Sequence, residues 1–118
     1  MPTNKKIKNK TVILASDHAG FKLKEEIKKL LVDKKKNVFD LGTNNTNSVD
    51  YPDFAHLLSK KIKNNKNKIG ILICGSGIGM DMTANKHKNI RAALCYDVKS
   101  TKLSRQHNNA NVMALGAR

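Results

Sequence analysis

The sequence has no tryptophan, two cysteines and few acidic residues, and these shortages exclude several classes of protein. Two cysteines are too few for a disulfide scaffold, and Cys74 and Cys95 do not form the CxxC pair of a zinc site. Aromatic residues make up only 4% of the chain, which argues against the stacking surface of a single-strand binder. No apolar run approaches the roughly 20 residues of a membrane helix, so no membrane partner is expected.

The charge is strongly one-sided, with 23 Lys and Arg against 9 Asp and Glu and a formal net charge of +14. Such a balance favours anionic partners, either nucleic acids or phosphorylated metabolites. The lysines are spread along the chain, however, as in a biased composition with many solvated side chains, so no specific nucleic-acid partner is expected. Residues 1–10 are predicted to form a flexible basic arm and lack the apolar segment of a signal peptide, which predicts a cytoplasmic protein.

Five apolar segments alternate with helical patterns. The segments expected to form strands are residues 11–15, 38–42, 69–74, 90–97 and 111–118. Between the first two, Leu23, Ile27 and Leu31 recur at helical spacing. Pro52 suits the first turn of a second helix, and residues 98–107 are expected to form another. The alternation predicts an α/β fold, a single domain with an open parallel sheet and helices on both faces, whose ligands bind beyond the carboxyl ends of the strands.

A glycine-rich loop follows the strongest predicted strand. The loop comprises Gly75, Ser76, Gly77, Ile78 and Gly79. A dinucleotide fingerprint would need its third glycine at position 80, which is Met80, although Asp97 stands where a ribose ligand could be wanted. A P-loop is excluded because no Gly-Lys-Ser/Thr follows. Two interpretations remain: a tight turn that requires small residues, or an anion hole built from backbone N–H groups and a helix N-terminus.

Cys74 stands at the entrance to this loop. A helix N-terminus favours the thiolate form of a nearby cysteine, which could then act as a nucleophile or as a base. The alternative is a small buried residue at a strand end. Cys95, inside a predicted strand, fits that structural role better.

Further polar residues follow the predicted strand ends or the last helix. The candidates are Asp17, His18, Tyr51, His107, Asn108 and Arg118. His107 suits general acid–base chemistry, or alternatively a helix C-terminal cap, and Arg118 could hold a phosphate as a fork. His56 and His87 are expected at the surface. A thiol, an oxyanion nest, histidines and cations suit proton transfer on a small phosphorylated carbonyl compound.

Several motifs together resemble the type B ribose-5-phosphate isomerases, within the sugar-phosphate isomerase family that includes galactose-6-phosphate isomerase subunits. These motifs are SDHAGF, DYPDFA, ILICGSGIGM, ANK, IRAAL and LSRQHNNANVMALGAR, in this order from about residue 12 to 118. The resemblance implies a Rossmann-like three-layer α/β/α domain over residues 11–118, with a five-stranded parallel sheet. It also implies a homodimer or dimer of dimers that interconverts D-ribose 5-phosphate and D-ribulose 5-phosphate in the pentose phosphate pathway, with no metal or organic cofactor.

The resemblance also implies roles for the candidate residues. Cys74 would be the base that moves a proton between C2 and C1 through an enediolate, and the loop Gly75–Gly79 would hold the enediolate oxygen. His107 would help to open the furanose ring, with Asn108 beside it as a substrate ligand. The remaining sugar and phosphate contacts would be Asp17, His18, Tyr51 and Arg118.

Two points bear on substrate and length. The RQHN motif around His107 favours the ribose enzyme over galactose-6-phosphate isomerase, while some relatives also act on allose 6-phosphate. The set of Cys74, His107 and Asp17 argues against the other alternative, a non-catalytic anion-binding module. Relatives usually continue past the arginine matched by Arg118 with a helix and a basic tail that add phosphate ligands and help to build the dimer. The resemblance therefore implies a domain without that helix and tail, and weaker phosphate binding.

Overall fold

A computed structural model describes residues 10–63 and 65–118 as one α/β domain. The elements in chain order are β1 (Thr11–Ser16), α2 (Phe21–Asp33), β2 (Val38–Asp40), α3 (Tyr51–Ile62), β3 (Lys68–Cys74), α4 (Ile78–Ala84), β4 (Ala92–Leu94), α5 (Val98–Asn108) and β5 (Val112–Gly116). The predicted basic arm lies, apart from residue 10, outside the described residues and stays a prediction.

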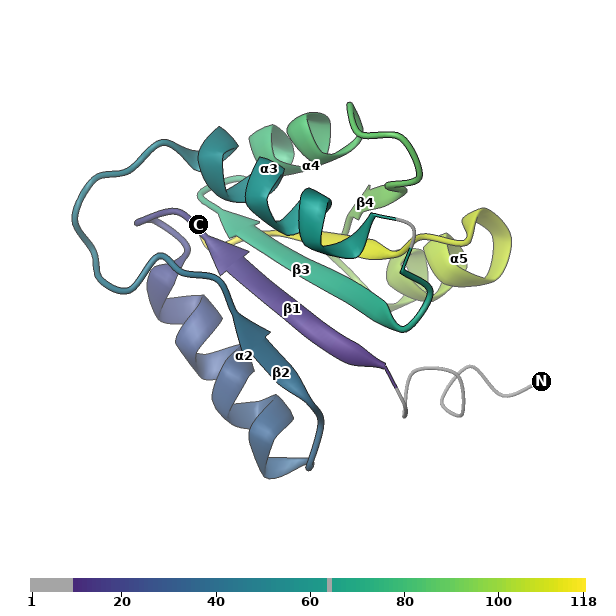
Figure 1. Cartoon of the computed structure of the whole chain (residues 1–118), viewed down its shortest axis with the longest axis horizontal. Coiled ribbons are helices and arrows are strands. Elements are labelled where there is room, and N and C mark those ends of the chain that lie inside the picture. Colours follow the sequence, from purple (N-terminus) through teal and green to yellow (C-terminus); the bar gives the residue numbers. More distant parts are fainter. Residues whose placement is uncertain (1–9, 64) are drawn as a thin grey trace.

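The five strands form one parallel sheet in the order β2-β1-β3-β5-β4 (Figure 1). The central strand β3 pairs with β1 from Thr11↔Lys68 to Ser16↔Ile73, and with β5 from Gly70↔Val112 to Cys74↔Gly116. This arrangement confirms the predicted five-stranded parallel sheet. From β1 the chain crosses to β2 on one side and then returns to β3 on the other, so the direction of winding reverses between β1 and β3. In open α/β sheets such a reversal opens a crevice at the carboxyl ends of the strands.

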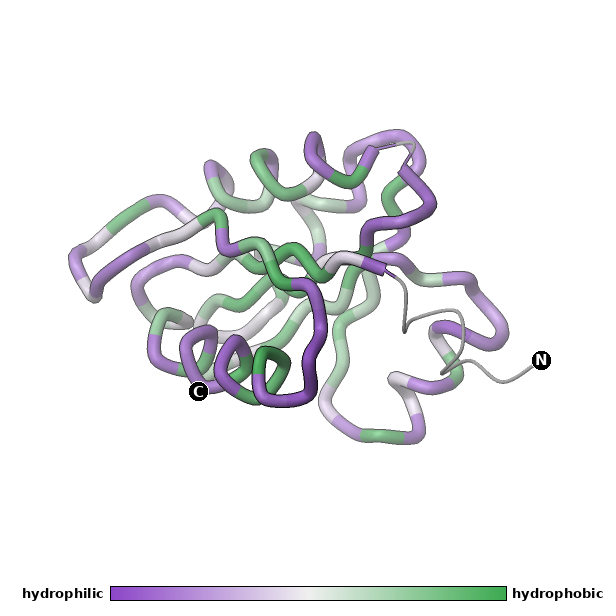
Figure 2. Tube along the Cα trace, turned by 60° about the horizontal axis from the view of Figure 1, so that its bottom comes forward, coloured by the Kyte–Doolittle hydropathy of each residue, from purple (hydrophilic) through white to green (hydrophobic). Residues whose placement is uncertain are grey.

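Alternate residues of each strand point to opposite faces of the sheet and make two cores. On one face, Ile13, Leu72 and Val112 pack with residues of α3 and α4. On the other face, Val12 and Leu14 pack against the apolar stripe of α2. The strands are apolar along most of their length, whereas the helices alternate between hydrophobic and hydrophilic residues (Figure 2). Helices therefore cover both faces of the sheet, as the sequence predicted.

The last two strands are shorter than the apolar segments that predicted them. Residues 90–97 were expected to form one strand, but only Ala92–Leu94 pair with β5. β4 is an edge strand with a neighbour on one side only, and beyond Leu94 the Cys95 N–H still donates to the Ala114 carbonyl at 3.0 Å. β5 ends at Gly116, and the two residues that follow it bond to the end of β3 and the start of the glycine loop. The N–H of Ala117 donates to the Cys74 carbonyl, and that of Arg118 donates to the Gly75 carbonyl.

Candidate active site

The thiol of Cys74 faces the glycine loop at the carboxyl end of the central strand. Its Sγ accepts a hydrogen bond from the backbone N–H of Gly77 at 3.1 Å. Gly77 is the N-cap of α4, so this donor belongs to the group of N–H bonds that a helix leaves free at its start. Cys74 is 5% exposed and contacts the α3/α4 core. The Gly77 N–H therefore points at a nearly buried sulfur at the start of the helix.

Two glycines of this loop are required by its geometry. Gly77 has φ +81°, and a Cβ there would lie 2.7 Å from Leu94 Cδ1 and 2.8 Å from the Leu115 carbonyl carbon. At Gly79 a Cβ would lie 2.5 Å from the ring of Tyr51. The glycines therefore let the loop press against β5 and let a tyrosine lie over it. Both interpretations of the loop from sequence are compatible with this geometry, since the turn is tight and the Gly77 N–H donates to the thiol.

Three other candidate residues lie just after β1 or at the start of α3. Asp17 follows β1, is buried, and donates its N–H to the Ile73 carbonyl at 3.2 Å, while its Oδ1 accepts the N–H of Gly20 at 3.0 Å. Tyr51 begins α3 and places its ring against Gly79. His18 Nδ1 accepts the N–H of Val49 at 3.1 Å, which ties the loop before Tyr51 to the end of β1. Asp17 thus contacts the end of β3, and Tyr51 contacts the glycine loop that follows it.

Arg118 lies on the other side of the loop. Its N–H donates to the Gly75 carbonyl at 3.0 Å, and its guanidinium is the nearest neighbour that a Cβ at Gly75 would meet, at 3.2 Å. A cleft of about 580 Å³ opens here, and Ser76 and Arg118 are among its lining residues. The structure therefore brings a cation and Ser76 of the loop to one cleft, whose lining includes Cys95 and Asp97 but not Cys74.

His107 and Asn108 lie elsewhere in the chain. Both end α5, which runs from the carboxyl end of β4 back to the opposite edge of the sheet (Figure 1). The Asn108 carbonyl accepts from Arg91 Nε at 2.6 Å, and Arg91 immediately precedes β4. An α-helix rises about 1.5 Å per residue, so the length of α5 separates these residues from the strand ends. A single chain does not bring His107 and Asn108 to Cys74.

Comparisons with known proteins identify the family of the chain. The sequence model of the Ribose/Galactose Isomerase family matches residues 12–118, which include every candidate residue. The chain belongs to this family. Ribose-5-phosphate isomerase B of Escherichia coli is 42% identical over 109 residues, a match that covers 92% of this chain and 73% of that protein.

Solved structures of family members have the same fold. Ribose 5-phosphate isomerase RpiB of Thermotoga maritima superimposes with a TM-score of 0.89 at 46% identity, covering 92% of this chain and 74% of that one. Ribose-5-phosphate isomerase B of Mycoplasma genitalium, solved with bound ribulose 5-phosphate, gives a TM-score of 0.87 at 48% identity, covering 92% and 72%. The Rossmann-like α/β/α architecture expected from the resemblance is thereby confirmed.

Four other residues considered from the sequence make contacts within the fold: Cys95, Asp97, His56 and His87. Cys95 is buried just after β4, with its Sγ 3.4 Å from the Ala93 carbonyl. Asp97 is the N-cap of α5 and accepts the N–H of Ser100 at 2.6 Å, a bond that lowers the pKa of its carboxyl. Its carboxylate caps a helix, so the weak case for a ribose ligand at Asp97 gains no support. His56 and His87 are half-buried and contact each other, with Nδ1 and Nε2 2.7 Å apart.

Two partly buried carboxyl groups, those of Asp81 and Asp40, were not among the residues singled out from sequence. Asp81 lies in the first turn of α4, where partial burial raises its pKa. Asp40 ends β2. Partial burial acts to raise its pKa, but hydrogen bonds from Lys24, the Gly42 N–H and Lys28 outweigh burial and hold it below its ordinary value. Position 24 shares the helical stripe of Ile27 and Leu31, and this spacing is the signal that could have indicated a buried lysine.

The described residues hold no metal cluster and no membrane-spanning helix. Within residues 10–63 and 65–118, no three His, Cys, Asp or Glu side chains gather in a way that could hold a metal ion. No helix in that part of the chain is both long enough and apolar enough to cross a bilayer. A hollow of about 600 Å³ lies over the sheet between α2 and α5, but none of its lining residues is a candidate site residue.

Proposed function

We propose that this chain interconverts D-ribose 5-phosphate and D-ribulose 5-phosphate. The observation that carries the proposal is the 3.1 Å hydrogen bond from the Gly77 N–H to Cys74 Sγ, inside a glycine loop that the family match includes. The ribose-5-phosphate isomerases B of Escherichia coli, Thermotoga maritima and Mycoplasma genitalium are 42%, 46% and 48% identical to this chain, and the last was solved with ribulose 5-phosphate bound. A thiol beside N–H donors suits the transfer of a proton next to a carbonyl group.

The proposed reaction moves one hydrogen and balances within the sugar. The Cys74 thiolate removes the proton from C2 of the open-chain aldose, the C2–H electron pair forms a C1=C2 double bond, and the carbonyl π electrons move to O1. The loop N–H groups stabilise the resulting enediolate. O2 then loses its proton to O1, the carbonyl forms at C2, and Cys74 returns a proton to C1. Carbon 2 is oxidised and carbon 1 is reduced, so no electrons leave the molecule.

The residues around the crevice would bind the substrate. Asp17 and His18 follow β1, Tyr51 lies against Gly79, and all three offer hydrogen-bonding groups for sugar hydroxyls or phosphate. Arg118 lies next to Gly75, and its planar guanidinium matches a phosphate. His107 would open the furanose ring by acid–base catalysis, with Asn108 as a neighbouring ligand.

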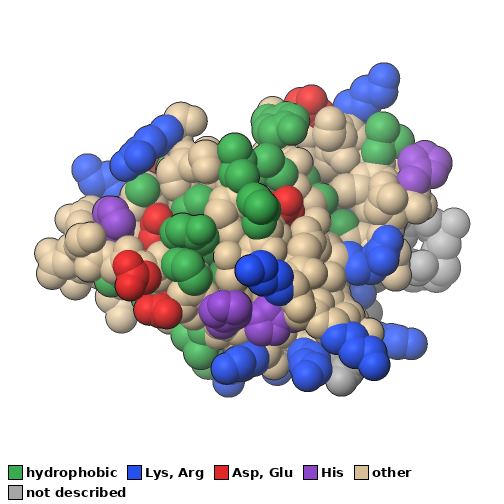
Figure 3. Space-filling model, turned by 90° about the horizontal axis from the view of Figure 1, so that it is seen from above, with side chains coloured by type: hydrophobic (Ala, Val, Ile, Leu, Met, Phe, Trp, Pro, Cys, Tyr) green, Lys and Arg blue, Asp and Glu red, His purple; other side chains and the backbone are tan. Residues whose placement is uncertain are grey.

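We further infer that the working unit is a homodimer or a dimer of dimers. His107 is exposed at the far end of α5, so only a second copy could present it to Cys74. Apolar side chains next to the loop offer a surface for that copy: Ile78 and Met82 of α4 are 51% and 64% exposed. The view onto α3 and α4 shows hydrophobic side chains gathered on this face, with most Lys and Arg toward its margins (Figure 3).

The proposal places the protein in the cytoplasm and in the pentose phosphate pathway, where its substrate is used. The family name also covers galactose isomerases, which keeps galactose 6-phosphate and allose 6-phosphate as alternative substrates. The test is to incubate the purified chain with each of the three aldose phosphates and follow ketose formation. The proposal predicts the fastest conversion for ribose 5-phosphate. Faster conversion of a hexose phosphate would show that ribose 5-phosphate is not the preferred substrate. Conversion of none of the three would overturn the proposed function.

A further inference from the structure

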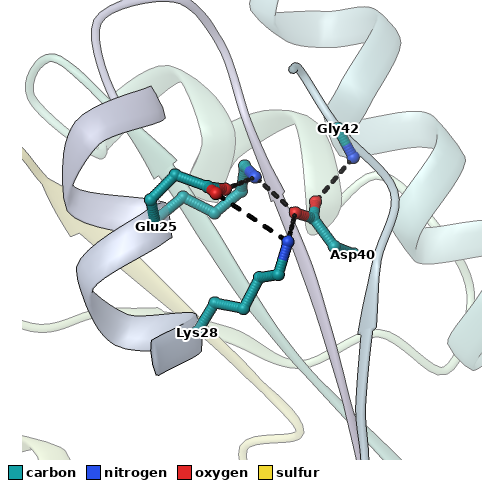
Figure 4. A network of polar contacts seen from close by, with 5 residues as sticks. Glu25, Lys28, Asp40 and Gly42 are labelled. Carbon is teal, nitrogen blue, oxygen red and sulfur yellow. Dashed lines mark hydrogen bonds and ion pairs between the residues drawn. The ribbon is translucent and has the colours of Figure 1, made fainter. Parts of the chain in front are cut away.

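Lys24 is fully buried, although it lies on an otherwise amphipathic helix. Its Nζ is 2.6 Å from Asp40 Oδ2 and 2.7 Å from Glu25 Oε2 (Figure 4). Burying a charge costs free energy, and replacing a buried ion pair by apolar side chains of similar size is often neutral or stabilising. Stability alone therefore does not account for a lysine at this position.

Asp40 uses its two oxygens for different purposes. Oδ2 accepts from Lys24 and, at 3.0 Å, from Lys28, whereas Oδ1 accepts the backbone N–H of Gly42 at 2.8 Å (Figure 4). The lysines hold the carboxylate at the end of β2, and the carboxylate holds the chain where it leaves that strand. The ion pair thus acts on a backbone position two residues farther on.

Gly42 and Thr43 in turn bind the residue that precedes Asp17. The Ser16 N–H donates to the Gly42 carbonyl at 2.8 Å, and the Thr43 N–H donates to the Ser16 carbonyl at 3.0 Å. These bonds extend the pairing of β1 and β2 beyond Asp40, up to the turn that carries Asp17 and His18.

The other end of the same loop returns to the site. The Val49 N–H donates to His18 Nδ1 at 3.1 Å, and two residues later Tyr51 begins α3 with its ring against Gly79. The side chains between these anchors, from Asn44 to Ser48, are exposed. The loop that delivers Tyr51 is therefore fixed at Gly42 by Asp40 and at Val49 by His18.

We propose that Lys24 and Asp40 are positioning residues for substrate binding. Lys24 holds the Asp40 carboxyl group, and Oδ1 of that group fixes the Gly42 N–H and through the loop sets the places of His18 and Tyr51. The inference rests on the proposed function for the identity of the substrate. Because neither residue touches the reacting carbons, loss of this anchor raises the KM for ribose 5-phosphate and leaves kcat nearly unchanged.

Two double variants separate positioning from stability. Lys24→Met with Asp40→Asn removes the buried charges but keeps an oxygen that can accept from Gly42. Lys24→Met with Asp40→Leu removes the charges and the acceptor together, with a side chain of similar shape. The matched control is Lys28→Met, since Lys28 contacts the same carboxylate oxygen from a 39% exposed position and such surface pairs contribute little.

The expected result is a KM about tenfold higher for the leucine double variant than for the asparagine one, with kcat within about twofold. Lys28→Met should match the unmodified chain. Equal KM values in the two double variants, whether raised or normal, would overturn the proposal.

Amide hydrogen exchange gives a second readout that needs no substrate. The Val49 amide should exchange faster in the leucine double variant than in the asparagine one, and equal rates would overturn the positioning role. If the expected exchange is seen but the unmodified chain converts no ribose 5-phosphate, the proposed function fails and the positioning role stands. If the leucine variant does not fold, the test is made on the unmodified chain. The exchange rates of its Gly42 and Val49 amides should then depend on denaturant concentration in the same way, and different dependences would refute the coupling.

Discussion

The sulfur of Cys74 and the backbone N–H of Gly77 are joined by a 3.1 Å hydrogen bond across the start of α4. The bond depends on the backbone of Gly77, whose φ of +81° turns its N–H back toward the end of β3. The proposed base and the proposed oxyanion site are therefore one structural unit, and changes to the loop should affect both.

Gly77→Ala should destabilise the fold and abolish turnover. A Cβ at this position would meet Leu94 and the backbone of Leu115 within 2.8 Å, in a conformation that L-residues rarely adopt. The combined backbone and steric cost should be roughly 2–4 kcal/mol. Urea unfolding monitored by circular dichroism measures it.

The matched control for that substitution is Gly75→Ala. A Cβ there would first meet the Arg118 side chain at 3.2 Å, and a flexible side chain can move away. Gly75→Ala should therefore fold with nearly unchanged stability, within about 1 kcal/mol. Equal destabilisation by the two substitutions would show that the positive φ and close packing of Gly77 do not limit which residue fits there.

Mixing two inactive variants should restore activity if the site is built from two copies. Cys74→Ala keeps His107, and His107→Ala keeps Cys74, so a mixed dimer has one complete site. Random exchange of subunits after unfolding and refolding together should recover about a quarter of the unmodified activity. Steady-state turnover of the refolded mixture measures this, with each variant refolded alone as control. Recovery of nothing, from chains that do form dimers, would place His107 outside the site of a partner.

Acidification should destabilise the protein through the histidine pair. Partial burial lowers the pKa of His87 below its ordinary value of 6.5, and the nearby charges of His56, Lys60 and Lys63 lower it further. The unfolded chain therefore binds a proton more tightly than the folded one. Stability from this group is present above pH 6.5 and is lost as the pH falls through the lower folded value.

Urea midpoints between pH 8 and pH 5 measure this loss. The double variant His56→Gln/His87→Gln lacks both titrating rings, so its midpoint should fall less over the same range. The same slope in the unmodified and double-variant proteins would assign the acid sensitivity to other groups.

The sequence predicted the sheet, and it placed several candidate residues at one edge of that sheet, because both follow from local patterns. The apolar runs predicted the strands, and the rule that ligands bind at the carboxyl ends of parallel strands brought Asp17, Cys74 and Arg118 to one edge. Met80, which breaks the dinucleotide fingerprint, is a fully buried core residue of α4. The departure from that fingerprint thus has a packing role.

Two features could not be predicted so directly. A helix that starts at a strand end returns to the opposite edge of the sheet, so His107 lies far from Cys74 although both were assigned to one site. Lys24 lies in a helix rich in lysine; its spacing from Ile27 and Leu31 places it on the apolar stripe, but its contact with Asp40 depends on how α2 packs against the sheet. Positions of this kind depend on tertiary contacts that composition does not reveal.

The central claim is that Cys74 transfers the proton in a pentose phosphate isomerisation. The most direct measurement is ¹H NMR of ribose 5-phosphate with the unmodified protein, with Cys74→Ala and with Cys74→Ser, each shown to be folded by circular dichroism. The account predicts conversion to ribulose 5-phosphate by the unmodified chain and a loss of about a thousandfold or more without the thiol. Undiminished conversion by Cys74→Ala, or none by the unmodified protein at high concentration, would contradict it.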